Sequence, residues 1–96
     1  MRKETISYRT TDGLADYQFS FEEQPEDDWR IYIEWQPSYQ GRETGIDATH
    51  RWSEDDRFYV CWTEDLHSLD DAKNIAALWA DTTQNYIRTG RFQQRK

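Results

Sequence analysis

The chain has 96 residues, which is enough for one small domain with its own core and too few for two. Its formal charge of −7 disfavours general binding to the phosphates of DNA or RNA. Hydrophobic residues make up only 35% of the chain but aromatic residues reach 16%, so a few large side chains must supply the core. We therefore expect residues 1–96 to form a single domain.

The composition also bears on compartment and chemistry. No run approaches the ~20 apolar residues of a membrane span, and the charged start leads into polar alternation instead of an apolar signal region. Cys61 is the only cysteine, which excludes an intrachain disulfide and a multi-cysteine metal site. No glycine-rich phosphate loop, zinc pattern or nucleophile elbow is present. We expect a cytoplasmic protein with no membrane contact, no cofactor and no enzymatic activity.

The first half of the chain alternates apolar and polar residues, as half-buried strands do. Residues 4–9 and 15–21 read as two strands joined by a turn at 10–13. The strongest strand is 29–35, after an acidic loop at 22–28. The side chains that this period places on the core face are Tyr17, Phe19, Phe21, Trp29, Ile31, Ile33 and Trp35.

The second half begins with a long loop, 36–47, that contains proline and glycine. A short strand at 48–52, a polar turn at 53–57 and a strand at 58–63 predict a further hairpin. In its last strand Phe58, Val60 and Trp62 face one way, and Tyr59 and Cys61 face the other.

A single helix is predicted at the C-terminal end. Ser68 and Asp71 resemble a capping box, so the helix begins at about Leu69, and Gly90 is a plausible C-terminal cap. Its apolar stripe is Ala72, Ile75, Ala76, Trp79, Thr83 and Tyr86. The predicted fold is α+β: an antiparallel β-meander of four to five strands with one C-terminal α-helix packed on one face.

A meander also sorts the charges, because successive loops alternate between the two ends of the sheet. One end then holds both termini and the loops 22–28 and 53–57, with nearly balanced charge. The other end holds the turn 9–14, the loop 36–47 and the helix entry, where eight carboxylates face two arginines for a net charge of −6. We expect a partner to bind at this acidic end.

Exposed tyrosines are a second indication of a partner-binding surface. Tyr32 and Tyr59 lie on the strand faces opposite the core, and if their strands are neighbours they form an aromatic patch typical of interfaces. The same pair equally fits a cross-strand contact that only stabilises the sheet. The predicted partner-binding residues are Tyr32, Tyr39, Arg42, Glu43, Asp47, Tyr59, Glu64 and Asp65.

These features favour a small acidic cytosolic interaction module, an adaptor or inhibitor, whose partner is a protein with a basic or mixed-charge surface. Its sharpest form is mimicry of nucleic acid, with carboxylates in place of phosphates. The alternative is a ligand-binding or enzymatic domain with a pocket between sheet and helix and His50 or Cys61 at its edge. Direct nucleic-acid contact through the basic residues of 88–96, with Phe92 for stacking, is weakened by the acidic loops.

The segment 64–71 combines four carboxylates with His67, which are ligands for a divalent cation. It matches no established loop pattern and lacks the glycine of a calcium loop. A solvated, acidic helix entry explains the same residues, because carboxylates favour the positive end of the helix dipole.

Overall fold

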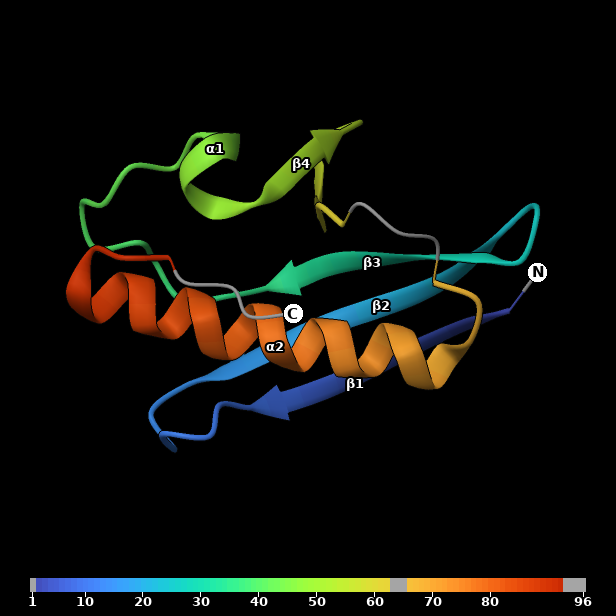
Figure 1. Ribbon diagram of the computed structural model, residues 1–96, viewed down its shortest axis with the longest axis horizontal. Coiled ribbons are helices and arrows are strands. Elements are labelled where there is room, and N and C mark those ends of the chain that lie inside the picture. The colour runs from blue at the N-terminus through green and yellow to red at the C-terminus, as the bar shows by residue number, and fades with distance from the viewer. Residues whose placement is uncertain (1, 63–65, 93–96) are drawn as a thin grey trace.

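The computed structural model describes residues 2–62 and 66–92. A five-stranded antiparallel sheet and one long C-terminal helix form the domain, so the predicted α+β class is confirmed (Figure 1). Neither described helix is both long and apolar enough to cross a membrane. The elements in chain order are β1 (Lys3–Arg9), β2 (Asp16–Gln24), β3 (Asp28–Trp35), α1 (Ile46–Thr49), β4 (Arg51–Glu54), β5 (Arg57–Val60) and α2 (Leu69–Thr89).

The strand order is β1-β2-β3-β5-β4, which differs from a simple meander. The first three strands are a meander, but the last hairpin places its second strand beside β3 and its first strand at the edge. Residues 46–49, expected in part to begin a strand, form the short helix α1 instead. Thr49 is fully buried there, and its carbonyl accepts a hydrogen bond from Trp79 Nε1 at 3.0 Å. This anchor holds the chain away from β3, so that it re-enters the sheet at the outer edge.

The changed order also reverses the helix relative to the prediction. The start of α2 lies beside the β2–β3 turn, where Asp28 Oδ1 accepts a hydrogen bond from the Leu66 N–H at 3.0 Å. The end of α2 lies beside the loop 36–45, where the Arg42 guanidinium donates to the carbonyls of Ile87 and Arg88 at 3.3 and 3.2 Å. The meander predicted that the helix entry and the long loop share one end of the sheet. In the structure they lie at opposite ends.

An aromatic core joins α2 to β2, as the alternation predicted. Trp79 is fully buried and meets Tyr17 and Phe19 edge-on, with ring centroids 6.0 and 6.1 Å apart. The Tyr17 hydroxyl donates to Gln84 Oε1 at 3.2 Å, which satisfies two buried polar groups at once. Large rings in edge-to-face contact provide much burial from few apolar residues.

Trp35 was expected in the core, but its side chain is 54% exposed. A β-bulge explains the difference: Phe19 pairs with Ile33 whereas Gln18 pairs with Trp35, which leaves Glu34 as an extra residue. The bulge moves Trp35 across from Gln18, on the side of the sheet away from α2. A one-residue irregularity in register reverses the face that a side chain occupies.

The predicted ends of α2 are confirmed. Ser68 Oγ accepts a hydrogen bond from the Asp71 N–H at 3.1 Å, and Gly90 ends the helix in the left-handed region with φ 80°. A hydrogen-bonded serine just before the first turn and a glycine just after the last turn satisfy backbone groups that the helix itself leaves free.

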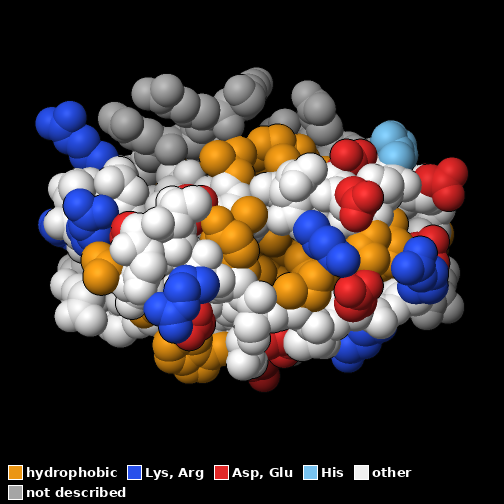
Figure 2. All heavy atoms as spheres, turned by 90° about the horizontal axis from the view of Figure 1, so that it is seen from below, with side chains coloured by type: hydrophobic (Ala, Val, Ile, Leu, Met, Phe, Trp, Pro, Cys, Tyr) orange, Lys and Arg blue, Asp and Glu red, His pale blue; other side chains and the backbone are white. Residues whose placement is uncertain are grey.

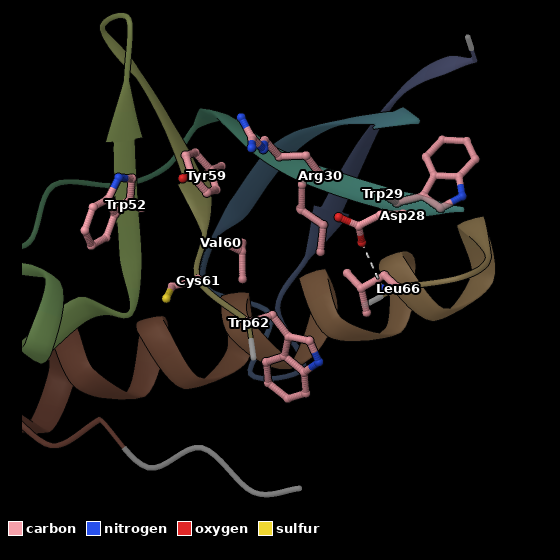
Figure 3. Close-up of a pocket in the computed structure, with 10 residues that line it drawn as sticks. Asp28, Trp29, Arg30, Trp52, Tyr59, Val60, Cys61, Trp62 and Leu66 are labelled. Carbon is pink, nitrogen blue, oxygen red and sulfur yellow. Dashed lines mark hydrogen bonds between the residues drawn. The ribbon is translucent and has the colours of Figure 1, made fainter. Parts of the chain in front are cut away.

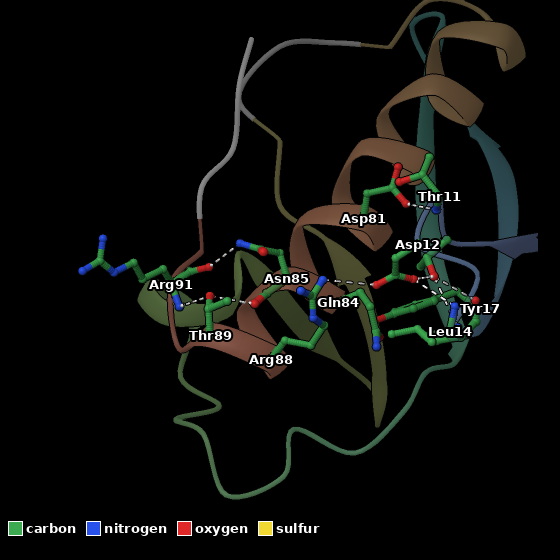
Figure 4. Close-up of polar contacts among 12 residues, drawn as sticks. Thr11, Asp12, Leu14, Tyr17, Asp81, Gln84, Asn85, Arg88, Thr89 and Arg91 are labelled. Atoms are coloured by element: carbon green, nitrogen blue, oxygen red, sulfur yellow. Dashed lines mark hydrogen bonds and ion pairs between the residues drawn. The ribbon is translucent and has the colours of Figure 1, made fainter.

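The β1–β2 turn is tied to α2 by polar contacts (Figure 4). Asp81 accepts hydrogen bonds from the Thr11 N–H and from the Tyr8 hydroxyl, both at 2.9 Å. Burial and the neighbouring Asp81 carboxylate raise the pKa of Tyr8 to about 12. Arg88 pairs with Asp12 at 3.6 Å, so this turn is fixed along the second half of the helix.

We expect Gly90→Ala to destabilise the domain more than Gly13→Ala. Both glycines have positive φ, so each alanine costs about 1–2 kcal/mol of backbone strain. An added Cβ at Gly13 meets nothing within 4 Å, whereas at Gly90 it lies 3.0 Å from Arg42 Nη1. Urea unfolding should show a larger loss for Gly90→Ala, and the excess should vanish in an Arg42→Ala background. Equal losses in both backgrounds would contradict a role for Arg42 at the helix end.

Candidate functional site

Aromatic side chains gather on the sheet face opposite α2, here called the open face. Residues directly opposite on neighbouring strands share a face, and Tyr59 of β5 lies opposite both Tyr32 of β3 and Trp52 of β4. The Tyr32 and Tyr59 rings meet edge-on with centroids 6.0 Å apart. Tyr32 and Tyr59 are neighbours, which is the condition on which the aromatic patch depended, and Trp52 extends the cluster to the edge of the sheet.

Two arginines lie across these rings. The Arg57 guanidinium is 3.5 Å from the centroid of Tyr32, and that of Arg30 is 4.5 Å from the centroid of Tyr59. Both are cation–π contacts, which favour a planar guanidinium over an aromatic face. We call the cluster of Arg30, Tyr32, Trp52, Arg57 and Tyr59 the open-face patch.

Carboxylates surround the patch and neutralise its arginines. Arg57 Nη2 donates to Glu22 at 2.9 Å and to Glu34 at 3.0 Å, and these hydrogen bonds raise the pKa of Arg57. Arg30 pairs with Glu54 at 3.2 Å. Burial alone would raise the pKa of Glu34, but hydrogen bonds from Ser20 and Arg57 and the charge of Arg57 lower it below its ordinary value. The patch therefore carries both signs of charge in close alternation.

The open-face patch is accessible and has the composition of an interface. Trp52 is 49% exposed, while the two tyrosines are half-buried. Tyrosine, tryptophan and arginine are the residues that contribute most to binding energy at protein interfaces. Trp35 adds a second exposed tryptophan, in a shallow hollow with Leu14 and Pro37.

A hollow opens where β5 separates from β3 (Figure 3). The two strands pair only through Tyr32–Tyr59 and Ile33–Phe58, and beyond these positions they diverge. The space between them is about 280 Å³ and is lined in part by Trp29, Trp62 and Leu66. It adjoins the open-face patch, because Arg30, Trp52 and Tyr59 form part of its wall.

Tyr39, predicted among the exposed tyrosines, is buried with 7% of its surface accessible. The Arg51 guanidinium lies 4.8 Å from its ring centroid, and Tyr86 packs edge-on at 6.0 Å. Burial raises the pKa of its hydroxyl, and the charge of the nearby Arg51 opposes this shift. The expectation that Tyr39 faces a partner is therefore wrong; it anchors the long loop to α2.

The other predicted site residues of the long loop are exposed at its surface. Arg42 is committed to the end of α2, and the Glu43 carbonyl accepts the Tyr86 hydroxyl at 2.8 Å. Asp47 lines a shallow hollow together with His50. Arg42, Glu43 and Asp47 are on the opposite side of the sheet from Tyr32 and Tyr59, so they are not part of the same surface. Glu64 and Asp65 lie outside the described residues.

The acidic end of the domain is not the predicted one. Six described carboxylates lie around the β2–β3 turn and the start of α2. Lys3 and Lys73 of this region are already paired with other carboxylates, so among the described residues Arg2 is the remaining cation near the six. At the long-loop end, the β1–β2 turn, the loop and the end of α2 contribute four carboxylates and four arginines, and the β4–β5 turn beside the end of β3 adds three carboxylates and Arg57, so this end is only mildly acidic. The reversal of α2 is the cause. The six carboxylates are Glu23, Glu26, Asp27, Asp28, Asp70 and Asp71.

His50 and Cys61 are neighbours along the backbone, since the Cys61 N–H donates to the His50 carbonyl at 2.9 Å. Their side chains line different hollows, and the His50 ring stacks on Phe92 with centroids 4.5 Å apart. This arrangement does not support a catalytic pair. Among residues 2–62 and 66–92, no three His, Cys, Asp or Glu side chains are grouped to hold a metal ion.

Comparisons with protein-family models, with curated proteins and with solved structures found no match for this chain. Sequence reasoning missed Arg30 and Arg57, the residues that complete the open-face patch. Their alternation with Trp29, Ile31 and Phe58 placed them on the open face in principle. Their positions over the rings depend on the pairing of β3 with β5, which no local pattern shows.

We expect Glu34 to contribute to the acid sensitivity of the fold. Its pKa in the folded protein lies below the ordinary 4.5, so its stabilising effect is present above that value and is lost as pH falls through the folded pKa. Glu34→Gln should lower the free energy of unfolding at pH 7 by up to about 1 kcal/mol, as for a partly exposed ion pair. It should also make the decline on acidification shallower in urea titrations. A variant profile parallel to that of the wild type would contradict this.

Proposed function

We propose that this protein is an interaction module, an adaptor or inhibitor, that docks its open-face patch on another protein. The observation that carries the proposal is the cluster of tryptophan, tyrosine and arginine on a sheet face that α2 leaves uncovered. Such side chains dominate the binding energy of interfaces when a partner excludes water from them. Because the patch is built on paired strands, little side-chain and backbone freedom would be lost on binding.

The charges of the patch indicate what kind of surface it fits. Glu22, Glu34 and Glu54 alternate with Arg30 and Arg57, so a partner with basic groups among acidic ones can pair with both signs. Complementary charges of this kind select the partner and set the register of docking more than they add affinity. A uniformly acidic partner surface would repel the three glutamates.

The acidic end supports a sharper version, in which carboxylates mimic nucleic-acid phosphates and the partner is a nucleic-acid-binding protein. Its unbalanced charge would steer a basic partner toward the domain before contact. Glu26, Asp27, Asp70 and Asp71 lie there on the β2–β3 turn and the first turn of α2.

A cytoplasmic location is part of the proposal, since Cys61 is a free thiol.

The alternative of a ligand-binding or enzymatic pocket between sheet and helix has less support. The hollow between α2 and the strands β1 and β2 is about 100 Å³, whereas sites for small molecules measure about 300–1,000 Å³. Its lining includes neither His50 nor Cys61; Cys61 lines the hollow of about 280 Å³ beside β3 and β5, and His50 lines an open surface hollow of about 540 Å³ beside the long loop.

We expect Trp52→Ser to weaken partner binding by at least about 30-fold, as loss of a central tryptophan of an interface does. Phe58→Ser is the matched control, because Phe58 precedes Tyr59 in β5, is 40% exposed and faces the other side of the sheet. The partner is first captured from the producing cells on the immobilised wild type, and affinities are then measured by calorimetry. Equal losses in the two variants would overturn the assignment of the open face.

The mimicry version makes a separate prediction about salt. Reversal of Glu26, Asp27, Asp70 and Asp71 to lysine should slow association by tenfold or more at low salt and flatten its salt dependence. Reversal of Glu43 and Asp47, at the less acidic long-loop end, is the control and should change the association rate little. A rate independent of salt for the wild type would eliminate mimicry while leaving the open-face proposal intact.

A further inference from the structure

The outer edge of β1 presents a row of backbone groups whose direction can be assigned. The Glu23 N–H donates to the Arg2 carbonyl and the Thr10 N–H to the Ala15 carbonyl, both at 2.9 Å. The β1–β2 register between these positions is uninterrupted, and hydrogen-bonded pairs alternate with non-bonded pairs in an antiparallel ladder. The even-numbered residues of β1 therefore bond β2. The N–H and C=O groups of Lys3, Thr5, Ser7 and Arg9 point away from the sheet.

This edge differs from the opposite one in length and charge. β1 runs for seven residues, and its central part Thr5–Tyr8 carries no charge. β4 has only four residues and leads into the acidic turn at Asp55 and Asp56. Short strands and charged side chains are the usual protection of a sheet edge, and the middle of β1 has neither.

An apolar hollow lies against β1 on the side of α2. It is lined in part by Ile6 and Tyr8 of β1 and by Ala76 and Ala77 of α2. Figure 2, which views the domain from the side where β1 lies in Figure 1, shows a hydrophobic area with charged side chains around it and a basic side chain across it; Lys73 is part of the lining of the hollow. A strand added to β1 would place every second side chain over this hollow.

On the open face the same edge is cationic at both ends. Lys3 and Arg9 have side chains 61% and 62% exposed, and their partners Glu22 and Asp16 belong to β2, one strand further in. An incoming strand therefore meets a cation near each end, with the hydroxyls of Thr5 and Ser7 between them. Acidic residues six positions apart would match the two cations.

A second copy of this chain is a poor occupant of the edge. Full antiparallel pairing of β1 with itself places Lys3 of one copy directly opposite Arg9 of the other on the open face. Like charges in directly opposite positions destabilise a sheet.

We propose that the β1 edge is a strand-addition site for an extended segment of another polypeptide. The segment runs antiparallel to β1, has an acidic residue at each end, carries β-branched apolar residues toward α2 and hydroxyl residues toward the open face. Backbone hydrogen bonds provide its affinity and the alternate side chains its specificity. This site is separate from the open-face patch.

The test uses the capped peptide Asp-Val-Thr-Val-Thr-Val-Asp, titrated into ¹⁵N-labelled full-length protein and followed by NMR. We expect saturable shifts centred on β1 and slower hydrogen exchange at Thr5 and Ser7. Ser7→Pro removes one outward N–H without removing a β1–β2 bond, and should weaken binding at least tenfold. Ser53→Pro is the matched control, because the Cys61–His50 bond and the β4–β5 register place the Ser53 N–H on the other outer edge.

A charge exchange keeps the test decisive if the proline variant does not fold. Lys3→Glu with Arg9→Glu should reverse the preference, so that a peptide with lysine at both ends binds better than the acidic one. Equal binding of both peptides to the wild type, no saturation at millimolar peptide, or binding unaffected by Ser7→Pro would overturn the proposal. If the chain without peptide forms a dimer and Ser7→Pro abolishes that dimer, the proposal is overturned, because a second copy of the chain then occupies the edge.

Discussion

Trp79 lies fully buried in α2, where its ring packs edge-on against Tyr17 and Phe19 and its Nε1 donates to the Thr49 carbonyl. One side chain thus joins the helix to the inner strand β2 and to the connection between β3 and β4. Removing a buried tryptophan costs about 3–5 kcal/mol, a large share of the 5–15 kcal/mol that holds a small domain together. Helix, sheet and the long connection are therefore parts of one cooperative unit.

The bond to Thr49 also determines how the chain enters the second half of the sheet. With residues 46–49 held against the helix, β4 begins at the outer edge, and β5 must return between β4 and β3. A chain leaving β5 then reaches the β2–β3 turn, and α2 starts there. The carboxylates of that turn and of the first helical turn meet as a result, so the position of the acidic end follows from a buried contact far from it.

The parts of the fold that depend on neighbours in sequence were predictable. Alternation identified the strands, and Ser68 and Gly90 marked the ends of the helix because capping is local chemistry. The strand order and the bulge at Trp35 were not, because both arise from contacts between segments far apart in the chain. The candidate site divides in the same way. The two-residue period of a strand shows which face of the sheet Tyr32 and Tyr59 occupy. The position of Arg57 over Tyr32, however, requires β3 and β5 to be paired.

A chain with a single long helix can cover only one face of its sheet, so the other face must be stable in water. Here Arg30 and Arg57 lie over the tyrosine rings while their charges are matched by Glu22, Glu34 and Glu54. Each charged group keeps part of its surface in water, so the network stabilises the free domain only modestly and is not locked into one pairing. The same groups can exchange an internal partner for an external one at small cost. A face arranged in this way is stable in water when no partner is bound, and its charges can pair with those of a partner that binds.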